Sequence, residues 1–299
     1  MCIIFSVSSE LSMAALVDAS PGTTTRSLLT TVFGDALLPR RQPSSVVDLA
    51  LLVAPLGVNE RAVRTTLLRL SRDGLVMGHR EGRRSLYAVA PTAIDTFRRA
   101  ETRIYECVDV SWDQQWTMAL IDPASDSTDR ARLQRELGWA GMAALQTGVL
   151  ASPTIAPDTV ATMAQEHQVG LTALLRSPLL AGSLDGDPQL AAFADPTGQL
   201  HELHEAHLEK WSSITASNVG DDHAFAIRTL LLDDWRRIAL KTLAAPRELL
   251  PDTWLGDEAQ EVTSELYDGL LAPSEAFLNA QLGSAKSRRT GFGSIKYRD

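Results

Sequence analysis

The residues with the clearest chemistry in this sequence are arginines that cluster between positions 61 and 84. That stretch contains Arg61, Arg64, Arg69, Arg72, Arg80, Arg83 and Arg84, and no lysine. A guanidinium group can donate two parallel hydrogen bonds to a phosphate, or to O6 and N7 of a guanine in the major groove. Such a density of arginine is typical of a surface that binds nucleic acid.

The charge of the chain is distributed unevenly. The 299 residues carry a net charge of −9, whereas residues 59–103 contain ten arginines and five acids and therefore carry +5. The remaining residues must then carry −14. A basic segment on an acidic body is the pattern expected of a DNA-reading module carried by other domains.

The first of these arginines lie in a segment with helical spacing. Val63, Leu67 and Leu70 recur at i, i+4 and i+7, which predicts one buried face. Asn59 stands where an N-cap belongs, and Gly74 stands where a helix can end with a positive φ. We therefore expect a capped helix whose arginines face solvent.

A hairpin is expected directly after this helix. Residues 75–77 and 85–89 read as strands, joined through a glycine-containing turn at 80–83. Upstream, residues 23–38 and 43–54 show helical spacing behind serine and threonine cap candidates. Two helices, a turn, a basic helix and an arginine-tipped hairpin are the order of a winged helix-turn-helix.

A recognition helix meets base edges through its first two turns, and its N-terminus offers free N–H groups to phosphate. The hairpin would reach the neighbouring backbone or minor groove. Arg69 and Arg72 are expected either to be structural or to face the DNA backbone. For the helix as a whole, the alternative to DNA binding is a basic face that is simply exposed to solvent. The predicted DNA-binding residues are Asn59, Arg61, Arg64, Thr65, Arg80, Arg83 and Arg84.

The remaining chain indicates a multi-domain α+β protein. Between 111 and 180 the pattern alternates strand, helix, strand, helix, strand, which suggests a ferredoxin-like unit. From residue 187 onward it is helical, with helices expected at 188–193, 196–212, 221–240, 246–249 and 257–281. The predicted divisions are a disordered leader at 1–22, a winged helix-turn-helix at 23–91, a linker helix at 92–110, the ferredoxin-like domain at 111–180, a helical C-terminal domain at 181–282 and a disordered basic tail at 283–299.

Several classes of protein are disfavoured. No apolar run approaches the roughly 18 to 20 residues that cross a bilayer, and no basic residue precedes the apolar start, which argues against a secretory signal. Two cysteines are too few for a disulfide framework or a cysteine metal cluster, which fits a reducing cytoplasm. The motifs of nucleotide-binding and hydrolytic enzymes are absent, so we expect neither an enzyme nor a cofactor.

Three blocks of sequence resemble the PaaX family of bacterial repressors, which regulate phenylacetic acid degradation. The first is SLLTTVFGDALLPR at 27–40 with LLVAPLGVNERAVRTTLLRLSRDGLVMGHREGRRSLYAVA at 51–90; the second begins with WDQQWTMALID at 112–122; the third is RTLLLDDWRRIALKTLAAPRELLPDTWLG at 228–256 with SELYDGL at 264–270. The resemblance implies a winged helix, a central ferredoxin-like domain and a helical C-terminal domain. It also implies a homodimer at a palindromic double-stranded DNA operator, released by phenylacetyl-coenzyme A or a related acyl-CoA.

Two groups of residues are candidates for binding such an effector. Trp112 or Trp116 could line an aryl pocket, with core packing as the alternative. On the longest C-terminal helix, Arg236, Arg237 and Lys241 could contact coenzyme A phosphates. The alternative for this basic group is salt bridges with neighbouring aspartates on the same helix.

Two further readings stay open. His201, His204 and His207 in HELHEAH could share a metal ion or could belong to an exposed polar helix; because this is not an HExxH motif, we expect no metal. Asp122 ends the first central strand, where a nuclease of similar fold would carry a metal-binding aspartate. The alternatives to a ligand-responsive repressor are therefore a metal-dependent nuclease and a ligand-independent DNA-binding protein.

Overall fold

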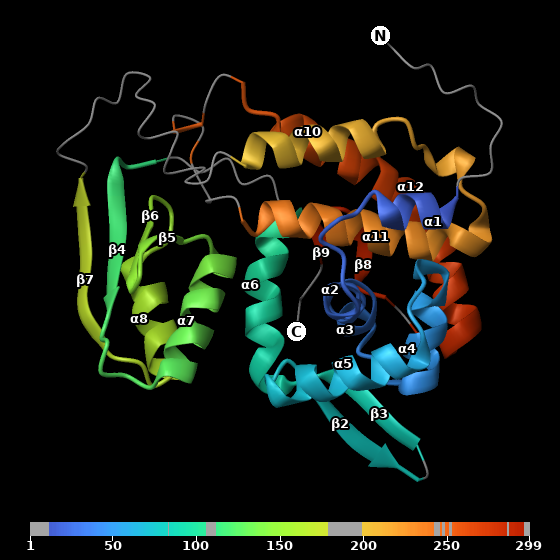
Figure 1. Ribbon diagram of the computed structural model, residues 1–299, viewed down its shortest axis with the longest axis horizontal. Helices are drawn as coiled ribbons and strands as arrows, with labels where there is room; N and C mark the ends of the chain where they lie inside the picture. Colours follow the sequence, from blue (N-terminus) through green and yellow to red (C-terminus); the bar gives the residue numbers. More distant parts are fainter. Residues whose placement is uncertain are drawn as a thin grey trace. The chain divides into compact units, whose positions relative to one another are not determined.

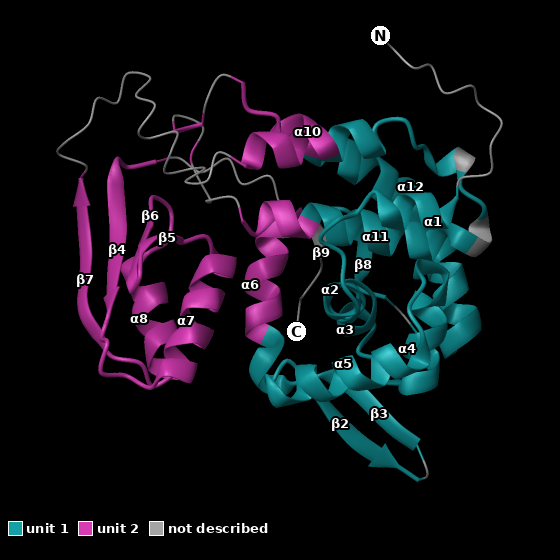
Figure 2. Ribbon diagram, in the orientation of Figure 1, with its two compact units in different colours: residues 1–94, 207–235, 260–299 teal, residues 95–206, 236–259 magenta. Residues whose placement is uncertain are grey.

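The computed structural model describes residues 12–295, apart from 83, 106–111, 179–198, 242–245, 247–248, 251–252 and 286. The protein is a mixture of helices and antiparallel sheets (Figure 1). It divides into two compact units (Figure 2). Unit 1 comprises residues 1–94, 207–235 and 260–299, and unit 2 comprises residues 95–206 and 236–259.

The first part of unit 1 has the predicted order of helices and strands. Its elements are α1 (Met13–Asp18), α2 (Thr25–Thr31), the π-helical η1 (Val32–Leu37), α3 (Leu38–Arg40), β1 (Ser44–Ser45), α4 (Val46–Val53), η2 (Ala54–Leu56), α5 (Glu60–Arg72), β2 (Val76–Glu81) and β3 (Arg84–Val89). The strands form an antiparallel sheet in the order β1-β3-β2. Ser45 caps α4 through a reciprocal bond pair with Asp48, as its sequence indicates.

The predicted disordered leader is wrong for the part of it that the structure describes. Ser12 caps α1, and Leu16 is largely buried. The Ser20 hydroxyl donates to Asp234 at 2.9 Å, and Lys210 Nζ donates to the Leu16 carbonyl at 2.9 Å. These long-range partners hold the segment, and no local pattern could have predicted them. Residues 1–11 lie outside the described residues.

Unit 2 contains one four-stranded sheet. After η3 (Pro91–Ala93) and α6 (Ile94–Tyr105) come β4 (Gln115–Ile121), α7 (Ser127–Ala140), β5 (Ala143–Gln146), β6 (Val149–Ser152), α8 (Pro157–Glu166) and β7 (Leu171–Pro178). The sheet order β5-β6-β4-β7 and the β-α-β-β-α-β sequence of elements are those of a split β-α-β arrangement. The second of the three strands expected between 111 and 180 is in fact a hairpin, β5 and β6, which turns at Gly148, whose φ of +78° favours glycine.

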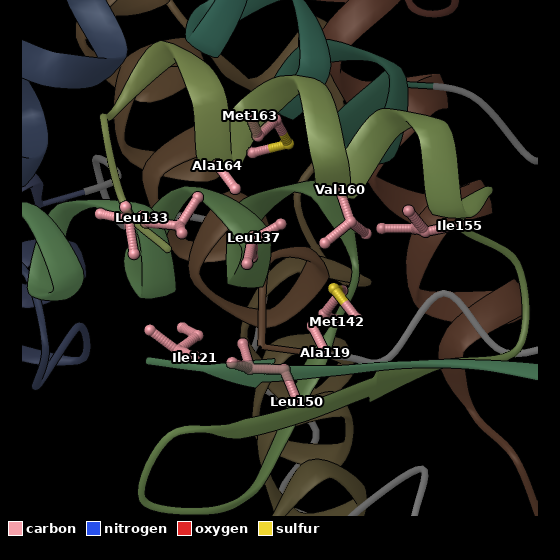
Figure 3. Close-up of a cluster of buried hydrophobic side chains, with 11 residues drawn as sticks. Ala119, Ile121, Leu133, Leu137, Met142, Leu150, Ile155, Val160, Met163 and Ala164 are labelled. Carbon is pink, nitrogen blue, oxygen red and sulfur yellow. The ribbon is translucent and has the colours of Figure 1, made fainter. Parts of the chain in front are cut away.

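The core of unit 2 lies between one face of this sheet and helices α7 and α8. Leu133 and Leu137 from α7, with Val160 and Met163 from α8, are fully buried. Figure 3 shows them in one cluster with side chains of the sheet such as Leu150. This packing of amphipathic helices on one face explains why the alternation of strands and helices could be predicted from apolar spacing.

The described residues of the C-terminal part are mainly helical up to residue 282. It contains α10 (Leu200–Trp211), η4 (Ala216–Asn218), α11 (Asp221–Ala239) and α12 (Gly256–Leu282), followed by a small hairpin of β8 (Arg289–Gly291) and β9 (Ser294–Ile295). The helix predicted at 188–193 lies outside the described residues, and only part of 246–249 is described. A disordered tail is a wrong prediction for residues 289–295, because Arg289 is buried beside Asp35.

Candidate nucleic-acid interface

Helix α5 is fixed at both ends by its own sequence. The Asn59 side chain accepts from the Ala62 amide at 2.9 Å, as predicted for an N-cap. At the other end Gly74 has a φ of +72°, and the Gly74 and Leu75 amides donate back to the carbonyls of Ser71 and Leu70. This pair of bonds is a Schellman motif, which satisfies carbonyls that the helix leaves open. The predicted cap and stop are both confirmed.

The two faces of α5 differ in burial and in charge. Val63, Leu67 and Leu70 are fully buried, which anchors the helix in unit 1. The opposite face is exposed and carries Arg61, Arg64, Thr65, Leu68, Arg69 and Arg72. The predicted division into a core face and an arginine face is therefore confirmed.

Most arginines of this face are available to an external partner. In the part of the chain that the structure describes, Arg61, Arg69 and Arg72 make no ion pair. Arg64 Nη2 lies 2.6 Å from Glu60 Oε1, and both side chains are about half exposed. Such an exposed i,i+4 pair is worth only about 0.3–0.5 kcal/mol, so it can be exchanged for another acceptor.

A hollow of about 510 Å³ lies between the start of α2 and the exposed face of α5. Arg26 forms one side of it and is held by Asp73 at 2.6 Å. Guanidinium and hydroxyl groups give this hollow several donors for an anion. The residues that line it are Thr24, Thr25, Arg26, Asn59, Arg61, Ala62, Thr65, Thr66 and Arg69.

Residues 24–26 of this hollow were not predicted as site residues. In the sequence, the TTTR stretch at 23–26 carries signals only for a helix start. Thr24 indeed caps α2 in a reciprocal pair with Ser27. The proximity of α2 to α5 depends on packing, so a single sequence holds no signal for it.

The β2–β3 hairpin projects from the helices of unit 1 (Figure 1). It turns at Gly82, whose φ is +60°. On the strands, Gly78 pairs with Tyr87, and a Cβ added at Gly78 would lie only 3.1 Å from the Tyr87 ring. Arg80 and Arg84 are exposed on the two strands. Arg83 lies outside the described residues. The hairpin thus presents basic side chains at the place where a wing is predicted.

The start of α2 is held from the C-terminal part of unit 1. The Asp233 carboxylate is fully buried and accepts hydroxyl hydrogen bonds from Thr23, Ser27 and Thr31 at 2.9 to 3.2 Å. Asp234 accepts from Lys210 Nζ at 2.8 Å. Both aspartates thus hold groups outside their own helix, on and before α2 and on α10.

The predicted effector residues all belong to unit 2. Trp112 and Trp116 pack edge to face with ring centroids 6.2 Å apart. Trp116 is buried against Ala151 and Leu249, so it contributes to a core cluster. Arg236 and Arg237 are partly buried, and Lys241 is exposed. Leu249 brings the chain after Lys241 to the tryptophan pair.

The histidine segment is more buried than an exposed polar helix would be. His204 and His207 are almost fully buried on α10, whereas His201 is exposed. His207 Nε2 lies 2.8 Å from Thr263 Oγ1, and His204 packs on Trp254 with centroids 4.7 Å apart. Among the described residues, no group of three or more His, Cys, Asp or Glu side chains could hold a metal ion.

Asp122 organises the turn after β4. Its Oδ1 accepts from the Ala124 amide at 2.8 Å, and its own amide donates to the Gly170 carbonyl at 2.9 Å. The first of these bonds is that of an Asx turn, and the second ties the turn to the residue before β7. Among the described helices, none is long and apolar enough to cross a membrane.

Comparisons with known proteins match most of the chain. Three family models cover it, described as PaaX-like protein at residues 24–93, PaaX protein central Cas2-like domain at 109–185 and PaaX-like protein C-terminal domain at 189–280. The transcriptional repressor PaaX of Escherichia coli K12 is 29% identical over 262 residues, which cover 85% of this chain and 82% of that protein. Among solved structures, uncharacterized protein Rv0674 from Mycobacterium tuberculosis is similar with a TM-score of 0.47, at 19% identity, over 85% of this chain and 98% of that one.

Proposed function

Since this chain belongs to the PaaX family, we propose that it is a DNA-binding transcriptional repressor. The observation that carries the proposal is the exposed face of α5, where arginines without ion-pair partners among the described residues extend from a capped and buried helix. A hairpin with exposed arginines follows it. In a winged helix-turn-helix, such a helix enters the major groove and such a hairpin reaches the adjacent backbone.

We assign recognition of the DNA base sequence to the first turns of α5. Arg61 and Arg64 can each bond bidentately to O6 and N7 of a guanine, worth about 1–3 kcal/mol of discrimination per base pair. The free energy of such a contact exceeds that of the exposed Arg64–Glu60 ion pair, so the ion pair breaks when Arg64 binds a guanine. Thr65 adds a hydroxyl whose proton is directed to the Arg61 carbonyl at 3.0 Å, so its oxygen remains an acceptor.

Backbone contacts are assigned to the two sides of that helix. On one side, Arg69 and the free N–H groups after Asn59 line the hollow beside α2, which suits a phosphate. On the other, Arg80, Arg83 and Arg84 of the hairpin contact phosphate or the minor groove. Contacts of this kind fix register and add affinity for any sequence.

The test begins with selecting duplexes that the full chain binds from a random pool. Arg64→Ala should then bind the selected duplex about 5- to 150-fold more weakly, with relaxed preference at one position of each half-site. The matched control is Arg98→Ala, because Arg98 is also exposed and pairs with Asp95 along its own helix. Unchanged binding by Arg64→Ala would refute the assignment of α5.

We further propose a homodimer that reads two half-sites of a palindromic operator, one or more helical turns apart, as the family resemblance implies. A repressor of this kind acts on chromosomal DNA in the cytoplasm. Analytical ultracentrifugation of the complex should give two chains per duplex. One chain per duplex at saturation would contradict the dimer.

The proposed effector is phenylacetyl-coenzyme A or a related acyl-CoA, bound in unit 2. The location of Trp112, Trp116, Arg236, Arg237 and Lys241 in the same unit supports this assignment. The thioester must bind the DNA-free state more tightly than the DNA-bound state in order to release the operator. Titrating it into the complex should release the duplex, and Arg237→Ala should require more thioester than wild type; release by free phenylacetate alone would exclude a coenzyme A site.

The nuclease alternative receives support only from the description of the central domain as Cas2-like, which concerns fold. We propose that the chain is not an enzyme. Incubation with single-stranded RNA or duplex DNA and Mn²⁺ should leave both intact. Cleavage that is lost in Asp122→Ala would establish the nuclease instead.

A further inference from the structure

Leu68 is an unusual residue on the exposed face of α5. With 62% of its surface accessible, it is more exposed than the other large apolar residues that stand out on the described surface, such as Val47 at 56% and Leu51 at 50%. A single exposed leucine needs no explanation in general. The position of Leu68 on this particular helix is what gives it meaning.

Helical geometry places Leu68 in the middle of the arginine face. It follows Arg61 by seven residues, Arg64 by four and Thr65 by three, and residues at these spacings share one side of a helix. The buried face of Val63, Leu67 and Leu70 is directed the opposite way. A surface that lies along this face of the helix and contacts Arg61 and Arg64 therefore also comes against Leu68.

The charges around Leu68 restrict what that object can be. An apolar protein surface would cover the leucine but would desolvate the guanidinium groups beside it, which is costly without acceptors. A DNA duplex supplies phosphates and guanine acceptors for the arginines. Its major groove also presents one apolar group, the C5-methyl of thymine. Duplex DNA thus complements both the charged and the apolar parts of this face.

We infer that Leu68 packs against the C5-methyl group of a thymine and thereby contributes to operator specificity. The inference rests on the proposed function, because it requires α5 to lie in the major groove. The leucine has no hydrogen-bonding group, so it distinguishes thymine from bases that lack the methyl through apolar burial alone. Removing one buried methyl group corresponds to roughly a fourfold loss of affinity.

The experiment removes that methyl group from the DNA and the leucine from the protein. Each thymine of the selected duplex is replaced in turn by deoxyuridine, which lacks only the C5-methyl, and binding of the full chain is measured. Wild type should lose about fourfold at one thymine of each half-site. Leu68→Ala should bind the thymine duplex more weakly and should be indifferent to uracil at that position, while its response at every other position is unchanged.

The matched control is Leu175→Ala, because Leu175 is a similarly exposed leucine on β7 of unit 2, at 48%. It should retain the uracil response of wild type. Retention of that response by Leu68→Ala, or a wild type insensitive to uracil at every position, overturns the inference while leaving the proposed function intact. A wild-type chain that selects no duplex overturns the proposed function and this inference together. Because Leu68 is exposed, thermal unfolding of Leu68→Ala should match wild type, and a lower midpoint would assign the leucine a structural role instead.

Discussion

Unit 1 contains two sets of arginines that differ in burial and in partners. The exposed set lies on α5 and the hairpin and comprises Arg61, Arg64, Arg69, Arg72, Arg80 and Arg84. The buried set comprises Arg40, Arg228 and Arg289. The same side chain thus serves two purposes within one unit, and its surroundings decide which.

The buried set is organised around two carboxylates. Arg228 is fully buried and donates to Asp35 Oδ2 through Nε at 2.9 Å and Nη2 at 2.6 Å. Arg289 Nε lies 3.0 Å from the other oxygen of Asp35. Glu275 accepts from Arg40 Nη1 at 2.6 Å and from Arg228 Nη1 at 3.3 Å. Four parts of the chain that are far apart in sequence (η1 with the adjoining α3, then α11, α12 and β8) are joined in this way.

The comparison shows that partners inside the fold distinguish a structural arginine from a binding one. Charges that are buried must be paired within the fold, since an unpaired buried charge is very costly. Charges that are exposed gain little from surface ion pairs and remain available to a polyanion. We therefore expect buried arginines to control stability and exposed arginines to control DNA affinity.

The largest loss of stability is expected for Arg228→Met, which leaves the buried carboxylate of Asp35 and the partly buried carboxylate of Glu275 short of a partner. The free energy of unfolding of the full chain should fall by about 3–5 kcal/mol, because breaking a buried pair from one side leaves an uncompensated charge. Arg61→Met, the same change on the exposed face, should alter it by less than about 0.5 kcal/mol. Denaturant unfolding measures both, and equal losses would remove the distinction between the two sets.

Local sequence determined the exposed set well. The Asn59 cap, the Gly74 stop and the spacing of Val63 and Leu67 all act within one helix, so periodicity and capping rules place the arginines on the opposite face. The hairpin likewise follows from a short glycine-containing turn. What periodicity did not single out was Leu68, because the expected signal of such a helix is charge.

The buried set could not be predicted, for a physical reason. Arg289 was assigned to a disordered tail because its neighbours are glycine, serine and basic residues. Its partner, Asp35, lies in a different part of the sequence, and its burial depends on the packing of α11 and α12. The same holds for Asp233, whose hydroxyl donors are on and before α2. A single sequence carries no signal for pairings at this separation.

A smaller loss in the free energy of unfolding is expected for Tyr267→Phe, which changes a residue beside the buried arginines. The Tyr267 hydroxyl donates to Asp35 Oδ1 at 2.6 Å, and a hydrogen bond to a charged acceptor is worth about 1.5–3 kcal/mol. Burial raises the pKa of Tyr267 well above its usual value, and the Asp35 carboxylate raises it further. The folded protein therefore keeps the proton at pH values where the unfolded chain releases it.

The sign of the pH dependence follows from that difference. Below about pH 10 the hydroxyl is protonated in both states and its contribution is fully present. Above about pH 10 the unfolded chain loses the proton while the folded chain retains it, so the contribution falls as pH rises. The difference in the free energy of unfolding between wild type and Tyr267→Phe should therefore be smaller at pH 11 than at pH 8. Burial lowers the pKa of Arg103 to about 10, but Arg103 titrates in both proteins and so leaves their difference unchanged. A difference in the free energy of unfolding that stays constant from pH 8 to pH 11 would contradict the raised pKa of Tyr267.

The smallest effect tests whether the hollow beside α2 binds a phosphate. Arg69 and Arg72 lie on the same helix, both are exposed, and neither makes an ion pair within the described part of the chain; of the two, Arg69 lines the hollow. The plot of log affinity against log salt concentration has a negative slope. Arg69→Gln should make this slope less steep by about 0.9, for selected and random duplexes alike, because one fewer phosphate is neutralised. Arg72→Gln should change the slope less, and neither should alter thermal unfolding. Equal changes in slope would mean that these arginines act through the general charge of the face, and the hollow would then have no part of its own in DNA binding.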